Sequence, residues 1–141
     1  MSVKKLTVYT DGGARGNPGP AALGVVIKAD GKTLRSFGEY LGDLTNNQAE
    51  YLALVRALET AKDLGAKEVE CVLDSELVVR QMNGEYRVKN QGLAPLYLKI
   101  WNLRQGFSRV TFRHVPREMN KEADAEVNAA LDKARGARKT G

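Results

Sequence analysis

The stretch Val3-Lys-Lys-Leu-Thr-Val-Tyr-Thr-Asp-Gly-Gly-Ala-Arg-Gly-Asn-Pro-Gly-Pro20 joins an apolar run, an acid and a glycine-rich segment. Residues Val3–Thr10 are rich in β-branched side chains and predict a strand, and Ala21–Ala29 predicts a second strand. Asp11 ends the first of these runs. A nucleotide-binding glycine loop leads into a helix and carries Gly-Lys-Ser/Thr, so this loop does not belong to that class. Asp11 is therefore the first candidate functional residue.

The rest of the chain divides into strands and helices with clear turn signals. Asp30-Gly31 predicts a hairpin, after which Thr33–Leu41 returns as a third strand. Apolar residues at helical spacing, closed by a glycine, predict a helix over Asn46–Leu64. The later predicted elements are a strand at Lys67–Leu73, helices at Ser75–Met82 and Leu93–Gln105, a strand at Arg109–Val115 and a helix at Met119–Ala134. This βββαβααβα order predicts an α/β fold in which helices flank a five-stranded mixed sheet.

The size and composition favour one globular domain. The chain has 141 residues, which we divide into a folded domain over 1–134 and a basic, flexible C-terminal tail over 135–141. It contains no apolar run near the ~20 residues of a membrane helix and no apolar region typical of a signal peptide. Cys71 is the only cysteine, which excludes an intramolecular disulfide and a Cys-rich zinc site. We expect a cytoplasmic, monomeric protein that does not bind membranes.

The positive charge is concentrated in the second half of the chain. The net charge is +5, and residues 71–141 carry 13 Lys/Arg against 8 Asp/Glu, whereas residues 1–70 carry 9 of each. Such an excess suggests a polyanionic partner, although charge alone is equally compatible with a role in solubility.

Four acids occupy boundaries of predicted elements, where a structural reason for a carboxylate is hard to find. Asp11 and Asp74 end strands, and Glu50 and Asp124 fall in the first turns of helices. If the two strands are parallel neighbours, their acids meet at the carboxyl edge of the sheet, where α/β proteins bind ligands. Gathered carboxylates repel one another unless cations lie between them, and a carboxylate-rich set suits Mg²⁺ or Mn²⁺. The acids therefore predict a two-metal site for phosphoryl chemistry.

Small and neutral residues flank these acids. Gly12 and Gly13 allow close approach of the backbone to a sugar–phosphate, and their amides could read the 2′-hydroxyls that distinguish RNA from DNA. The neutral hydrogen-bonding candidates are Asn17, Thr45, Asn46 and Gln48. Either Thr45 or Asn46 is also a suitable N-cap for the first helix, and the two roles are compatible.

Four segments resemble the motifs of the type 1 ribonuclease H family. They are Tyr9–Pro20, Thr45–Glu50, Asp74–Gln81 and Asn120–Asp124, and the resemblance covers about residues 3–132. It implies a ribonuclease H-like fold and an endonuclease that cleaves the RNA strand of an RNA–DNA hybrid, leaving 5′-phosphate and 3′-hydroxyl ends. It also implies that the four acids hold two Mg²⁺ ions, with Mn²⁺ as the alternative. Thr45 and Asn46 are then expected to hold a DNA phosphate at the helix N-terminus.

The chain departs from this family in three places. The segment Asn83–Leu93 is short and holds two basic residues, where many relatives carry a Lys/Arg-rich grip on the hybrid. Many relatives place a histidine in a mobile loop before the fourth acid, whereas His114 of this chain lies in a predicted strand. We expect His114 to be a packed structural side chain, and Arg117 to approach the phosphate as a charge. Glu76 stands where relatives often have a glutamine facing the RNA.

Two other functions compete with a ribonuclease H. A hybrid-binding module without catalysis would gain nothing from gathering negative charge at a phosphate site. A recombinase or exonuclease core of the wider superfamily is disfavoured by the hybrid-reading residues around Asn17 and Thr45-Asn46. The sequence leaves open the preference for Mg²⁺ or Mn²⁺ and whether double-stranded RNA is also cut.

Overall fold

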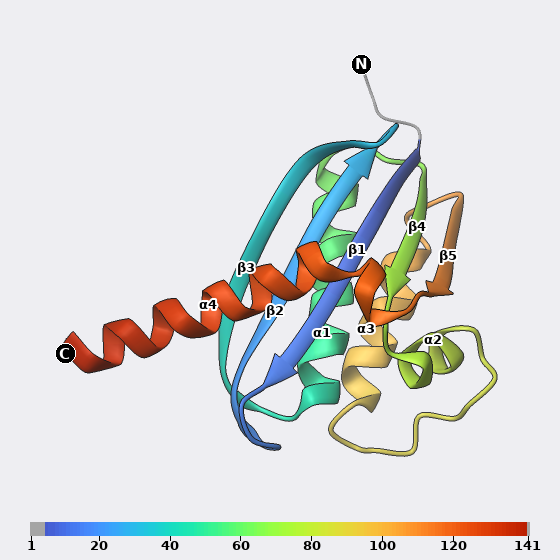
Figure 1. The fold of residues 1–141 in the computed structure, drawn as a ribbon. Coiled ribbons are helices and arrows are strands. Elements are labelled where there is room, and N and C mark those ends of the chain that lie inside the picture. Colours follow the sequence, from blue (N-terminus) through green and yellow to red (C-terminus); the bar gives the residue numbers. More distant parts are fainter. Residues whose placement is uncertain (1–4, 141) are drawn as a thin grey trace.

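The computed structural model describes the backbone of residues 5–140 and the side chains of residues 5–136. Val3 and Lys4, which the sequence places in the first strand, lie outside the described residues. Figure 1 shows a twisted sheet with helices on both of its faces. No helix in the described part of the chain is long and apolar enough to span a membrane.

The sheet has five strands, as the sequence predicts. They are β1 (Lys5–Ala14), β2 (Gly19–Ala29), β3 (Lys32–Leu44), β4 (Glu68–Leu73) and β5 (Arg109–His114). Their order across the sheet is β3-β2-β1-β4-β5. β1, β2 and β3 form an antiparallel meander, and β4 and β5 add to β1 in parallel. The predicted fold class, a mixed α/β sheet flanked by helices, is confirmed.

The helices cover the two faces of the sheet unequally. They are α1 (Asn46–Asp63), α2 (Glu76–Met82), α3 (Ala94–Arg104) and α4 (Lys121–Thr140), with a 3₁₀ turn η1 (Arg117–Met119) before the last. α1 packs against β1 and β2, and α3 packs against α1. α4 crosses the opposite face over β1, β2 and β3, and its C-terminal part extends beyond the sheet (Figure 1). The front of β4 and β5 is left without a helix in this view.

The main core lies between the sheet and α1. α1 buries a full apolar face, which consists of Ala49, Tyr51, Ala53, Leu54, Val55, Ala57, Leu58 and Ala61. This face meets Leu6 and Val8 of β1 and Val25 of β2, all fully buried. Cys71 lies in the same core as a free, buried thiol, and burial raises its pKa.

The ends of two elements differ most from the sequence prediction. β1 does not end at Thr10 but continues to Ala14, because β2 provides an antiparallel partner as far as the pair Ala14↔Ala21. α4 runs to Thr140, so the predicted boundary after Ala134 falls inside a helix. Alanine, arginine and lysine are good helix formers, and a single glycine in that stretch is tolerated at a cost of about 1 kcal/mol.

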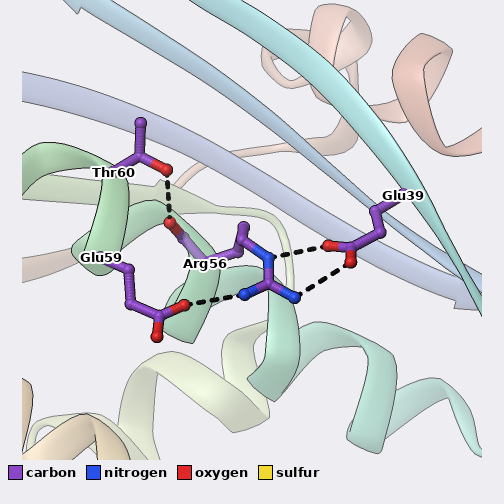
Figure 2. A network of polar contacts seen from close by, with 4 residues as sticks. All are labelled: Glu39, Arg56, Glu59 and Thr60. Carbon is purple, nitrogen blue, oxygen red and sulfur yellow. Dashed lines mark hydrogen bonds and ion pairs between the residues drawn. The ribbon is translucent and has the colours of Figure 1, made fainter. Parts of the chain in front are cut away.

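An ion-pair network fixes the outer strand β3 to α1. The guanidinium of Arg56 donates two hydrogen bonds to the carboxylate of Glu39, at 2.8 and 3.0 Å, and a third to Glu59 at 2.9 Å (Figure 2). Thr60 donates to the main-chain carbonyl of Arg56 at 2.8 Å. These side chains are partly exposed, so the pairs contribute little energy each, and their two-pronged geometry mainly orients the strand.

Close contact between α4 and the sheet requires glycine at two positions, Gly24 of β2 and Gly38 of β3. A methyl group on Gly24 of β2 would lie 2.2 Å from the carbonyl oxygen of Ala123 in α4. Because that oxygen belongs to the backbone, the helix itself would have to move. The start of α4, and with it Asp124, is therefore positioned by the absence of a side chain at Gly24.

We expect Gly24→Ala to lower the free energy of unfolding by about 1–3 kcal/mol, through overpacking of α4 against β2. Gly136→Ala is the matched control, because a methyl there meets nothing within 4 Å. It should raise stability by up to about 1 kcal/mol, since alanine favours a helix over glycine. Urea denaturation of both variants measures the difference. Equal stabilities for Gly24→Ala and the wild type would contradict this account of the packing.

Candidate functional site

The four predicted acids line one cavity of about 500 Å³. They come from separate elements and are Asp11 in β1, Glu50 in α1, Asp74 directly after β4, and Asp124 in α4. The prediction that they converge is therefore confirmed as a matter of position, and their chemical roles stay predictions. The parallel pairing of β1 with β4 brings Asp11 and Asp74 to the same end of the sheet.

Local structure sets the direction of each acid. Along β1, Leu6, Val8 and Thr10 are buried against the α1 side, so alternation turns Asp11 toward the α4 side. Gly12 faces α1, where a methyl group would lie 2.3 Å from the carbonyl carbon of Ala49. This close contact between β1 and α1 places Glu50, which follows Ala49 in the helix, next to the strand.

The first turn of α1 is held by a capping box, which settles the open choice of N-cap. The Thr45 hydroxyl accepts a hydrogen bond from the amide of Gln48 at 3.1 Å, and the Gln48 side chain accepts from the amide of Thr45 at 3.0 Å. Thr45 is therefore the N-cap, and Gln48 is its reciprocal partner. This local arrangement fixes where Glu50 enters the cavity.

Two asparagines tie the end of β1 and the following loop to the same helix. The side-chain carbonyl of Asn46 accepts from the amide of Ala14 at 2.8 Å. The side-chain carbonyl of Asn17 accepts from the amide of Asn46 at 3.0 Å. Both bonds draw the glycine-rich segment onto the N-terminus of α1, next to the acids.

Burial and neighbouring negative charges disfavour the ionised forms of Asp11, Glu50 and Asp74. Burial, followed by the charge of Asp74 and a hydrogen bond shared with Asp124, raises the pKa of Asp11 to about 8. Burial also raises the pKa of Glu50 to about 7, although a hydrogen bond from Ser75 opposes the shift. Burial raises the pKa of Asp74 as well, and the charge of Arg117 partly offsets that effect. A cation is the ordinary means of relieving such mutual repulsion.

The donor set suits a hard divalent cation. Oε2 of Glu50 is buried and has no hydrogen-bond partner among the described residues. Within that part of the chain, no three His, Cys, Asp or Glu side chains are arranged to hold one ion by themselves. Mg²⁺ usually binds through one or two carboxylates and keeps water or substrate phosphate as its other ligands. The carboxylates therefore fit ions that share their coordination with a substrate, and not a closed protein cage.

The other predicted site residues are divided between the cavity wall and its surroundings. Gly12, Gly13, Asn46 and Arg117 line the cavity. Asn17, Thr45 and Gln48 are outside the described lining and act on it through the hydrogen bonds to the helix start.

Arg117 and His114 differ as the sequence predicts, with one correction. Nη2 of Arg117 lies 3.9 Å from Oδ1 of Asp124, and the arginine side chain is 80% exposed, so it is free to meet an incoming anion. The sequence places His114 inside a strand that runs to Val115, whereas His114 is the last residue of β5. The expectation of a packed side chain is wrong, because His114 is exposed. By alternation His114 shares a face with the buried Phe112, but it stands at the end of the edge strand β5.

Sequence reasoning missed three polar residues of the cavity lining, which are Arg15, Ser75 and Asn128. Ser75 lines the cavity, hydrogen-bonds Glu50 and caps α2 through the amide of Val78 at 3.3 Å. Asn128 also lines the cavity, and its side-chain amide lies 3.4 Å from Oδ2 of Asp124. Their spacing was a usable signal, because Ser75 directly follows an acid and Asn128 lies one helical turn after another.

Comparison with known proteins identifies the family. The family model described as "Reverse transcriptase-like" matches residues 9–130. Ribonuclease HI of Halobacterium salinarum is 43% identical over 131 residues, which are 92% of this chain and 66% of that protein. The Bifunctional protein Rv2228c of Mycobacterium tuberculosis is also 43% identical, but this chain spans 36% of its length. The curated relatives are thus longer than the matched region.

Solved structures give the same result over nearly the whole chain. The RNase H1 of Halobacterium salinarum superposes with a TM-score of 0.89 at 42% identity, covering 92% of this chain and 98% of that one. LC11-RNase H1, solved in complex with an RNA/DNA hybrid, superposes with a TM-score of 0.88 at 50% identity, with coverages of 92% and 98%. The fold and the acidic cavity define a ribonuclease H-like α/β domain. Within that class, the chain belongs to the type 1 ribonuclease H family.

The raised pKa values predict how stability depends on pH without metal. Asp11 and Glu50 have pKa values of about 8 and 7 against ordinary values of 3.8 and 4.5, so the folded state binds protons more tightly than the unfolded state. Their contribution to stability is fully present below about pH 4 and is lost as the pH rises through 7 and 8. In EDTA, Asp11→Asn should therefore gain Tm relative to the wild type, by more at about pH 9 than at about pH 5. Differential scanning calorimetry at each pH measures the Tm difference between Asp11→Asn and the wild type.

Asp63→Asn is the control, because Asp63 is exposed at the end of α1. Its Tm difference from the wild type should stay nearly constant over the same range. A constant difference for Asp11→Asn would show that Asp11 carries no burial or repulsion penalty.

Proposed function

We propose that this protein is a metal-dependent endonuclease that hydrolyses the RNA strand of RNA–DNA hybrids, leaving 5′-phosphate and 3′-hydroxyl ends. The observation that carries the proposal is the convergence of four carboxylates in one cavity, with the pKa of Asp11 raised to about 8. Membership of the ribonuclease H family and the similarity to LC11-RNase H1, which was solved with a hybrid, support the substrate class.

Two divalent ions fit this cavity, Mg²⁺ in the first place and Mn²⁺ as the alternative. Asp11, Glu50, Asp74 and Asp124 would hold them, and the buried, unpartnered Oε2 of Glu50 supports that assignment. When bound, the ions supply the charge that activates water and stabilises the departing 3′-oxygen.

The remaining residues bind and orient the substrate in this proposal. Thr45 and Asn46 stand at the N-terminus of α1, where the helix dipole favours a phosphate of the DNA strand. The backbone of Gly12 and Gly13 lines the cavity beside Asp11, where it can approach a 2′-hydroxyl. Asn17 and Gln48 orient the helix start through their hydrogen bonds. Arg117 brings positive charge to the scissile phosphate and transfers no proton, because arginine stays protonated.

The two rival functions differ from this one in their products. A binding module would retain the hybrid without cutting it, although a phosphate site without cations gains nothing from four acids. A recombinase or exonuclease core would act on duplex DNA. Incubation with hybrid, double-stranded RNA and duplex DNA, each with Mg²⁺ or EDTA, separates the three. Internal, Mg²⁺-dependent cleavage of only the hybrid's RNA strand is the expected result.

Removal of one charge from the cluster should abolish catalysis without unfolding the protein. We expect Asp11→Asn and Asp74→Asn each to lower turnover by at least ~10³-fold, about 4 kcal/mol of barrier. Hybrid affinity should persist, because repulsion toward the phosphate falls. Asp63→Asn, remote from the cavity, should keep full turnover. Steady-state kinetics with circular dichroism decide this, and substantial Mg²⁺-dependent turnover by Asp11→Asn or Asp74→Asn would refute the assigned centre.

Arg117 and His114 make opposite predictions. Arg117→Ala should lower turnover at least about tenfold, roughly 1.4 kcal/mol of barrier, with no pH-dependent step added near neutrality. Since His114 is exposed, His114→Ala should change stability by less than about 0.5 kcal/mol and leave turnover near wild type. Rates measured between about pH 6 and pH 9 test both variants. A hundredfold loss in His114→Ala, with Arg117→Ala unaffected, would instead make the histidine the catalytic group.

A further inference from the structure

β1 and β4 separate just before the acids. Their recorded pairing ends at Tyr9↔Val72, whereas β1 stays paired with β2 as far as Ala14. Beyond this fork, the main-chain carbonyl of Thr10 accepts a hydrogen bond from Nδ2 of Asn120 at 2.9 Å. A side chain 110 positions away thus meets β1 where the strand partner leaves it.

Asn120 also forms the start of α4. Its main-chain carbonyl accepts the amide hydrogen bond of Asp124 at 3.2 Å, which begins the helix. Its residue surface is 2% exposed, and Oδ1 is buried without a partner in the described part of the chain. A buried acceptor without a partner costs free energy. This cost indicates that the hydrogen bond donated by Nδ2 to Thr10 is the reason for an asparagine at this position.

The two hydrogen bonds of Asn120 therefore involve the backbone at or next to two of the acids. Asp11 is the residue after Thr10, and Asp124 donates its own amide to Asn120. The carboxyl groups of Asp11 and Asp124 line the same cavity. Their charges repel when both are ionised, so an independent tie is needed to keep them at this separation.

We propose that Asn120 is a positioning residue that fixes the spacing of Asp11 and Asp124, and so sets the affinity of the cavity for divalent cations. This inference rests on the proposed function, because the divalent cations concerned are those of the proposed nuclease site. Asn120 is absent from the described lining of the acidic cavity and borders a separate hollow beside Tyr9 and Lys28. It therefore acts through the backbone that carries the acids, and not by contact with substrate.

The test is cation binding without nucleic acid. Isothermal titration calorimetry with Mn²⁺ should show ~10–100-fold weaker binding in Asn120→Ala, the usual effect of losing a partner behind the ligands. The Mg²⁺ concentration for half-maximal turnover should rise by a similar factor. The KM for hybrid at saturating Mg²⁺ should stay within about twofold, because phosphate-contacting residues are untouched.

Two further variants separate positioning from simple loss of stability. Asn120→Leu keeps a similar volume, removes the unpartnered acceptor and deletes the donor, so it should fold and show the same loss of Mn²⁺ affinity. Val69→Ala removes buried volume at the opposite end of β4, and should lower Tm without changing Mn²⁺ affinity. Wild-type affinity in both Asn120 variants, or an equal loss in Val69→Ala, overturns the inference.

The proposed function can fail separately. A wild-type protein that neither binds Mn²⁺ nor cleaves hybrid would refute the nuclease itself. A wild-type protein that does both, with Asn120 variants that match it, refutes only the positioning role.

Discussion

The mutual repulsion of four carboxylates is the constraint around which the rest of the structure is arranged. Burial and neighbouring charge raise the pKa of Asp11 to about 8 and that of Glu50 to about 7, so this corner works against folding near neutral pH when no cation is present. The apolar face of α1 and the buried strands oppose that penalty with a large hydrophobic core. Stability and the proposed chemistry are therefore located in different parts of one domain.

The acids stay close because backbones approach one another where side chains would interfere. Gly12 lets α1 reach β1, and Gly24 lets α4 reach β2, each with a carbonyl group within 2.5 Å of where a methyl would be. These contacts set the distances between Asp11 and the acids on α1 and α4. Hydrogen bonds complete the arrangement, through the capping box of Thr45 and Gln48 and through Asn46 to the end of β1. The site is thus pre-organised by rigid elements, as the proposed two-ion mechanism would require.

The polar residues around the cavity combine structural and proposed binding roles. Asn17 and Asn46 hold the glycine-rich segment on α1, and this places their amide groups where a nucleic-acid strand would pass. Arg117 differs from them, because it is 80% exposed and approaches Asp124 only at 3.9 Å. An exposed positive charge at the rim and neutral groups behind it suit the binding of a polyanion.

The sequence by itself determined the features that depend on residues close together in the chain. Alternation and helical spacing predicted the strands and helices, and turn residues predicted their order, because each depends on neighbours a few positions apart. The position of acids at element boundaries, together with the parallel pairing expected of β1 and β4, was enough to predict that Asp11, Glu50, Asp74 and Asp124 converge. Tertiary structure decided whatever depends on distant partners. β1 runs past Asp11 because β2 pairs with it. His114 is exposed at the end of the edge strand β5, and Asn120 meets Thr10 across 110 positions of sequence. Burial, and the pKa shifts that follow from it, exist only once these distant segments pack together.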